Sequence, residues 1–241
     1  MKRFLYVLFF ILAVCSCSMS QEQKVYLVSV GISDYPGRKN DLRLPEADAK
    51  VIAEIYGINS NAETALLLNG DATKANIVST MRSVYGRARS NDVVVFFFSG
   101  HGLEQGGFVA YDDELTYDEV RRAFSSCRAK HKVIFADACF SGKIRSGSSQ
   151  SVSAKPKMDI MLFLSSRNNE VSYERTNMKN GFYTTCLARC LRGGADVNKD
   201  RRITAKELYD AVSEGVIRLS GGKQHPVMWG SFDDDMPVMI W

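Results

Sequence analysis

Short apolar runs alternate with amphipathic stretches along most of the chain. The runs are continuous, as expected for strands that are covered on both faces of a sheet. The amphipathic stretches place apolar residues three and four positions apart, which is a helical spacing. The predicted strands cover residues 25–30, 65–68, 93–98, 132–136 and 160–164, and the predicted helices cover residues 44–56, 75–85, 117–124, 183–191 and 204–218.

Strands that alternate with helices predict an α/β fold. We expect a three-layer sandwich, with a mostly parallel central sheet of about six strands and helices on both faces. Residues 24–241 are predicted to form a single domain. A basic, serine-rich stretch at residues 143–157 interrupts the alternation. It is predicted to be a flexible surface loop, because a further strand of the same sheet follows it.

The first 20 residues are predicted to be a signal peptide. A basic start precedes eleven consecutive apolar residues, 4–14, and this run is shorter than the roughly 20 residues that span a bilayer. Cys17 lies where a bacterial lipoprotein would be lipidated, so two outcomes stay open: a lipid anchor on Cys17, or ordinary cleavage near Ser18 or Ser20. The protein is predicted to be exported, as a periplasmic, membrane-anchored or extracellular protein that meets a membrane only through such an anchor.

Charge and cysteine content exclude two other classes of protein. The net charge is +4 and falls to about +2 without the signal peptide, which argues against a nucleic-acid-binding protein. Six cysteines in 241 residues are too few for a disulfide scaffold. Cys127, Cys186 and Cys190 are expected to lie in the core.

The two most apolar strands both lead into reactive residues. Residues 93–98 precede SGHG at 99–102, and residues 132–136 precede DACFSG at 137–142. If these strands are parallel neighbours, His101 and Cys139 emerge side by side at the sheet edge where ligands bind. A thiol beside an imidazole suits nucleophilic acyl transfer, and the backbone N–H groups of Gly102 and Cys139 could stabilise an oxyanion. The alternative is that Cys139 is a buried packing residue.

The SGHG and DACFSG segments resemble the motifs of caspase/metacaspase-like cysteine peptidases. Weaker similarities at residues 44–49, 165–170 and 180–184 extend the resemblance from residue 24 to about residue 230. It implies the caspase-haemoglobinase fold, His101 as acid–base, Cys139 as nucleophile, protein or peptide substrates and no required cofactor. Phe140 stands where metacaspases often have His, and the long C-terminal blocks of eukaryotic members are missing, which suggests a compact bacterial relative.

The residue before Ala138 bears on specificity. Caspases that cleave after Asp have Gln there, whereas this chain has Asp137, as do metacaspases, which cleave after Arg or Lys. The resemblance assigns Asp137, Asp48 and Ser99 to the substrate pocket, where carboxylates would select a cation. Alternatively, Asp137 caps a turn and Asp48 stabilises the first turn of its helix. Basic residues in the 143–157 loop are then candidate sites of self-cleavage.

A second motif, at residues 196–207, matches six positions of an EF-hand calcium loop. Arg201 stands where the turn favours Gly, and Thr204 with Glu207 could instead form a helix capping box. Some metacaspases need calcium through other acidic residues, which makes the groups at 112–113 and 233–235 candidates, but both are interpreted as solvated loops. Besides the endopeptidase, two functions stay open: a catalytically silent caspase-like module that binds peptides or partners, and a calcium-binding protein that uses residues 196–207.

Overall fold

The computed structural model describes residues 22–103, 106–138, 160–166 and 178–241. Its centre is a six-stranded sheet with the strand order β2-β1-β3-β6-β7-β9. The first five strands in this order pair in parallel, and β9 adds to β7 in the antiparallel sense. The predicted mostly parallel sheet is thus confirmed. The bounds are β1 Val25–Gly31, β2 Ala62–Leu68, β3 Val93–Ser99, β6 His131–Asp137, β7 Ile160–Leu164 and β9 Val227–Trp229.

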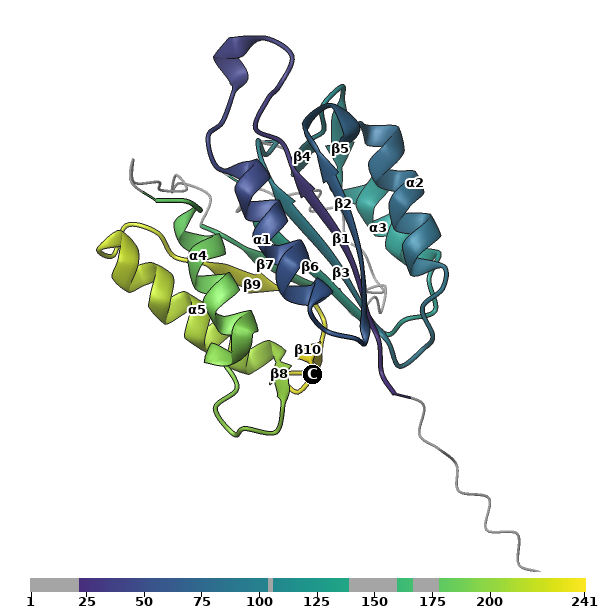
Figure 1. The fold of residues 1–241 in the computed structure, drawn as a ribbon, viewed down its shortest axis with the longest axis vertical. Helices are drawn as coiled ribbons and strands as arrows, with labels where there is room; N and C mark the ends of the chain where they lie inside the picture. The colour runs from purple at the N-terminus through teal and green to yellow at the C-terminus, as the bar shows by residue number, and fades with distance from the viewer. Residues whose placement is uncertain (1–21, 104–105, 139–159, 167–177) are drawn as a thin grey trace, which may run out of the picture.

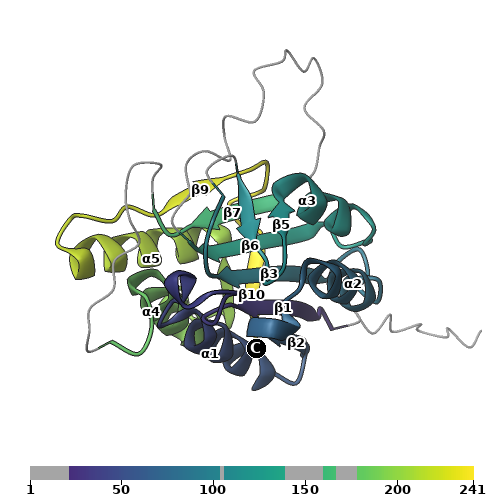
Figure 2. The same ribbon diagram turned by 90° about the horizontal axis from the view of Figure 1, so that it is seen from above.

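Helices cover both faces of this sheet (Figure 1). Helices α1, α4 and α5 pack on one face, and α2 and α3 pack on the other; the same separation is visible from above in Figure 2. Helix α4 continues into a π-helical turn at Cys190–Gly194. The bounds are α1 Pro45–Gly57, α2 Lys74–Tyr85, α3 Tyr117–Ser125, α4 Phe182–Arg189 and α5 Ala205–Ser220.

The central strand β3 shows why the apolar runs form strands that are buried on both faces. Its side chains alternate between two cores: Phe96 and Phe98 pack with α2 and α3, while Val95 and Phe97 pack with α1, α4 and α5. All four are fully buried. Burial of each such side chain stabilises the fold by roughly 1.5–3 kcal/mol, so a polar residue at any of these positions would be costly.

The structure also contains short strands that the sequence pattern does not predict. Strands β4 (Gly107–Val109) and β5 (Glu114–Thr116) form a hairpin, and β8 (Arg202–Thr204) pairs with β10 (Pro237–Ile240). The pattern does not predict strand β9 either, and β2 begins three residues before its predicted start. Segments of three or four residues are too short to show a period, and their strand conformation depends on the partner they pair with.

Two predicted segments lie outside the described residues: the signal peptide and the 143–157 loop. Within the ranges that the structure does describe, no helix is both long and apolar enough to cross a bilayer. Cys127, Cys186 and Cys190 are buried free cysteines, so the prediction that they lie in the core is confirmed.

Candidate active site

The site is built at the carboxyl edge of the parallel strands. Strands β3 and β6 are neighbours, and their register places Ser99 directly opposite Asp137. His101 follows Ser99 by two residues, just as Cys139 follows Asp137. Cys139 itself lies outside the described residues, which end at Ala138 on this side. The pairing of β3 with β6 nevertheless brings the two motifs to the same edge, as their sequence positions predict.

The imidazole of His101 is held by a backbone carbonyl. Its Nε2 atom lies 2.8 Å from the carbonyl oxygen of Asn40, a residue of the 3₁₀ turn Arg38–Asn40. A carbonyl oxygen can only accept a hydrogen bond, so this contact assigns the ring proton to Nε2. In the neutral ring Nδ1 then carries the lone pair that can accept a proton, which is what a general base needs.

The chain after His101 folds back as an irregular antiparallel ladder. Gly102 forms an isolated bridge with Phe108. The ladder bonds on either side run from Val109 N to the His101 carbonyl (2.9 Å) and from Leu103 N to the Gly107 carbonyl (3.1 Å). In this type of pair the bridged residue directs its own N–H away from the partner strand. The N–H of Gly102 is therefore not used by the ladder, as an oxyanion donor requires.

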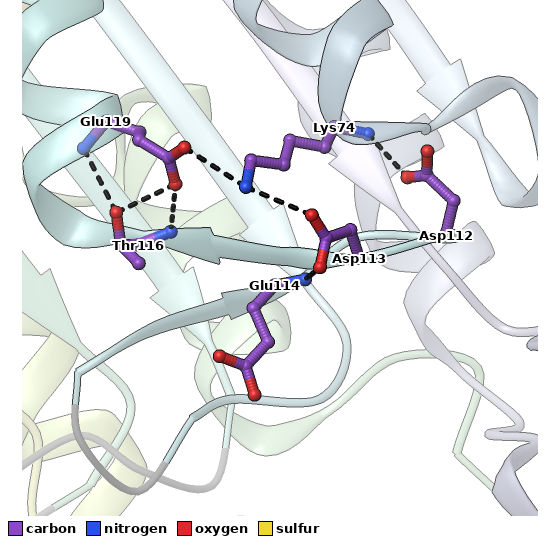
Figure 3. A network of polar contacts seen from close by, with 6 residues as sticks. All are labelled: Lys74, Asp112, Asp113, Glu114, Thr116 and Glu119. Carbon is purple, nitrogen blue, oxygen red and sulfur yellow. Dashed lines mark hydrogen bonds and ion pairs between the residues drawn. The ribbon is translucent and has the colours of Figure 1, made fainter.

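A polar network anchors the β4–β5 hairpin to α2 and α3 (Figure 3). The Lys74 ammonium group forms ion pairs of 3.1 Å with Asp113 and with Glu119, and the Lys74 N–H donates to Asp112 Oδ1 at 2.8 Å. These hydrogen bonds and charges raise the pKa of Lys74. Asp112 and Asp113 are exposed, as expected for a solvated loop, and both carboxylates also have a partner on α2.

Two buried carboxyl groups meet near the same edge. Asp48 in the first turn of α1 is 2% exposed and Asp137 at the end of β6 is 7% exposed. Burial, and after it the charge of Asp137, raises the pKa of Asp48 to about 8. The site can therefore hold a proton at neutral pH, and a cation that entered it would favour release of that proton.

Each carboxyl group has polar partners around it. Asp48 Oδ2 accepts from Ser99 Oγ (2.9 Å), and Asp48 Oδ1 accepts from Asn180 Nδ2 (2.9 Å) and from the Gly181 N–H (3.1 Å). Asp137 Oδ2 accepts from both the N–H (3.2 Å) and the hydroxyl (2.8 Å) of Thr184. The three predicted pocket residues Asp48, Ser99 and Asp137 are thus brought together.

Gly181 separates the two carboxyl groups. A Cβ atom at this position would lie 2.6 Å from Asp137 Oδ2 and 3.6 Å from Asp48 Oδ2. Gly181 is also the N-cap of α4, where it has no side chain to accept the helix N–H groups. Asp137 takes over that task for Thr184. Asp137 therefore both caps α4 and contributes charge to the site, so the two interpretations of this residue are compatible.

Comparisons with known proteins identify the family and the fold of the chain. The model of the caspase domain family matches residues 25–236. The chain belongs to this family. Its caspase domain is also similar in fold to the crystal structure of protein GSU0716 from Geobacter sulfurreducens, with a TM-score of 0.67 and 18% identity, over 90% of this chain and 97% of that one. None of the curated proteins matches the chain.

Sequence reasoning missed three residues of the site in this caspase domain. Asn180, Gly181 and Thr184 bind the two carboxyl groups. The segment that contains them, NGFYT at 180–184, resembles a family block, but the sequence alone does not show which carboxylates it meets. That pairing depends on the packing of the start of α4 against the start of α1 and the end of β6.

The 196–207 loop of the caspase domain has a helix-capping role. Glu207 Oε2 accepts from both the N–H (3.0 Å) and the hydroxyl (2.9 Å) of Thr204, and Thr204 Oγ1 accepts from the Glu207 N–H (3.2 Å). Asp196 and Asp200 accept backbone N–H groups within the loop. Among the residues that the structure describes, no three His, Cys, Asp or Glu side chains form a group able to hold a metal ion. Calcium binding here stays a prediction.

Proposed function

We propose that this caspase domain is an exported cysteine endopeptidase that cleaves after Arg or Lys. Cys139 is the nucleophile and His101 the acid–base, and the N–H groups of Gly102 and Cys139 form the oxyanion site. The family supports the peptidase class. The single observation that supports basic specificity is the buried pair Asp48 and Asp137 at the edge where His101 lies.

The chemistry follows from these roles. The thiol of Cys139 gives its proton to His101 Nδ1 and its sulfur bonds to the scissile carbonyl carbon, while the oxyanion accepts hydrogen bonds from the backbone. Collapse of this intermediate breaks the C–N bond, and the leaving amine takes the proton from His101. Water then attacks the thioester and gives a proton to His101. That proton returns to sulfur when the C–S bond breaks and the acid product leaves.

Peptide-coumarin substrates that end in Arg, Lys or Asp test this function. We expect the wild type to release coumarin from the Arg and Lys substrates and not from the Asp substrate. Both C139A and H101A should reduce release to background, whereas the matched control C127A, which removes a buried thiol elsewhere, should retain it. A preference for the Asp substrate would contradict the proposed specificity.

Covalent labelling separates an enzyme from a silent binding module. An arginine-terminated acyloxymethyl ketone should label Cys139 in the wild type and fail to label it in H101A. A folded wild type whose thiol stays inert would instead support a catalytically silent module that binds peptides or partners.

We further propose that the enzyme cuts itself within residues 143–157. This loop follows the Cys139 motif and contains Lys143, Arg145, Lys155 and Lys157, basic side chains that an enzyme cleaving after Arg or Lys would accept. The purified wild type should separate into two fragments, and C139A should remain whole. Cleavage that persists in C139A would exclude self-processing.

Export and lipidation are part of the same proposal. Metabolic labelling with a palmitate analogue should mark the protein in a bacterial host, and C17A should lose the label. Absence of label from the wild type would exclude the lipid anchor and leave ordinary cleavage of the signal peptide.

A further inference from the structure

The side chain of Tyr35 lies next to His101 although the two residues are 66 positions apart. Tyr35 belongs to the segment that follows β1 and is 5% exposed. Its ring centroid is 4.9 Å from that of the His101 imidazole, with the planes tilted by 49°. The Asn40 carbonyl that accepts from His101 Nε2 comes from the same segment. Residues after β1 therefore contact the imidazole twice.

The Tyr35 hydroxyl occupies a place in the ladder between His101 and β4. The bonds around the Gly102–Phe108 bridge make His101 and Val109 a pair that should exchange two backbone hydrogen bonds. One of these is present, from Val109 N to the His101 carbonyl at 2.9 Å. In place of the other, the His101 N–H donates to Tyr35 Oη (3.0 Å), and Tyr35 Oη donates to the Val109 carbonyl (3.1 Å).

This inserted hydroxyl spaces the two chains. A direct backbone bond spans about 2.9 Å between nitrogen and oxygen, whereas two bonds in series through a hydroxyl span more, so the His101 nitrogen and the Val109 carbonyl oxygen are held farther apart than in a regular ladder. Gly100 makes room for the hydroxyl, since a Cβ atom there would lie 2.6 Å from Tyr35 Oη. Burial also raises the pKa of Tyr35 to about 12, so the hydroxyl keeps its donor proton.

We propose that Tyr35 is a positioning residue for His101. Its hydroxyl holds the His101 N–H away from the Val109 carbonyl and its ring packs against the imidazole, so that Nε2 meets the Asn40 carbonyl. The effect on turnover rests on the proposed function, in which His101 is the acid–base. The effect on the position and tautomer of the imidazole does not depend on the proposed function.

The variant Y35F removes the hydroxyl and keeps the ring. Without the bridge, the His101 N–H and the Val109 carbonyl are drawn into direct contact and the imidazole moves with its main chain. On the arginine substrate we expect kcat to fall by about 10- to 100-fold, as a displaced catalytic group does, with KM within twofold of the wild type. The matched control is Y56F, which also removes a buried hydroxyl bonded to a backbone carbonyl, that of Val238 at 2.9 Å, and should leave kcat unchanged.

An NMR measurement makes the test independent of catalysis. The chain has three histidines, so long-range ¹H–¹⁵N spectra of the imidazoles can be assigned with H131Q and H225Q. In the wild type and in Y56F we expect His101 to be the tautomer protonated at Nε2, and in Y35F we expect a mixture of tautomers. If the wild type cleaves no peptide, the proposed function fails while these spectra still decide the role of Tyr35. A wild-type-like kcat or an unchanged His101 tautomer in Y35F would overturn it.

The wild type provides a second measurement should Y35F not fold. Because its N–H is bonded to Tyr35 Oη, the His101 amide should exchange with deuterium at least tenfold more slowly than the Gly102 amide, which the ladder does not use. Equal and fast exchange of both amides would overturn the proposal as well.

Discussion

The substitution D48N separates the catalytic from the structural role of the buried carboxyl pair. An asparagine has the shape of aspartate, and its Oδ1 can keep accepting from Asn180 and from the Gly181 N–H. Its Nδ2 can donate to Ser99 Oγ, because a hydroxyl group both donates and accepts. The hydrogen bonds from Asn180 and Gly181 can thus be retained and the one with Ser99 can reverse its direction, so the main loss is the titrating group.

The pKa of Asp48 sets the size of the effect on stability. Burial and Asp137 raise that pKa from 3.8 to about 8, so the folded state binds a proton that the unfolded state has released. The resulting contribution to stability is fully present below about pH 4 and is lost as the pH rises toward 8, by about 1.4 kcal/mol per pH unit. Between pH 5 and pH 8 the wild type should lose up to about 4 kcal/mol that D48N does not lose.

Urea unfolding at pH 5, 6, 7 and 8 measures this difference. The quantity of interest is the free energy of unfolding of D48N minus that of the wild type. We expect this difference to rise steadily with pH and to be positive at pH 8. The control is D92N. Asp92 is also buried, but its two oxygens accept from the N–H groups of Lys24 and Arg89, so an amide N–H would face a donor and destabilise the protein at every pH. A flat difference for D48N, or a loss of stability at pH 8, would refute the reasoning.

The same variant should lose activity while it gains stability. Removing one partner of a buried charge pair costs about 2 kcal/mol or more, which is about 30-fold in kcat/KM for the arginine substrate. If Asp48 had a purely structural role at the start of α1, cleavage by D48N would equal that of the wild type. Higher stability at pH 8 together with unchanged cleavage would therefore contradict the proposed pocket.

Four further predictions follow from the structure. For wild type, KM for the arginine substrate should fall as the pH rises from 6 to 8, because the cation binds best when Asp48 has released its proton; a pH-independent KM would contradict this. G181A should lose about 1–3 kcal/mol of stability and most of its peptide cleavage, because the new methyl group would lie 2.6 Å from Asp137 Oδ2. Urea unfolding and peptide cleavage measure the two effects, and wild-type values in both would exclude the tight contact. E207A should lower stability by about 1 kcal/mol through loss of the capping box, equally in calcium and in a chelator; a loss confined to calcium would show that the loop is a calcium site. K74M should speed deuterium exchange in β4 and β5 and leave β1 unchanged, as the Lys74 ion pairs anchor this hairpin; unchanged exchange in the hairpin would refute that.

Much of the fold could be predicted because its strands are buried on both faces. The runs at 93–98 and 132–136 are apolar throughout, and such runs do not suit a surface strand or an amphipathic helix. The capping of α5 could also be predicted from the sequence, since Thr204 and Glu207 form the capping box that their spacing indicates. Strand β9 and the short pairs β4–β5 and β8–β10 could not be predicted, because their residues become strands through pairing with distant partners.

The longer strands and the helices, and the two motifs that carry His101 and Cys139, follow from the sequence alone. These are local properties: hydrophobic period, glycine turns and adjacent reactive side chains. The tertiary structure decided which distant groups meet. Asp48 and Asp137 are 89 positions apart, and their shared burial, which raises the pKa of Asp48 to about 8, exists only when α1, β6 and α4 pack together. The hydroxyl of Tyr35 likewise enters the ladder at His101 through packing, because hydrogen bonds between distant segments depend on the folded geometry and leave no periodic trace in the chain.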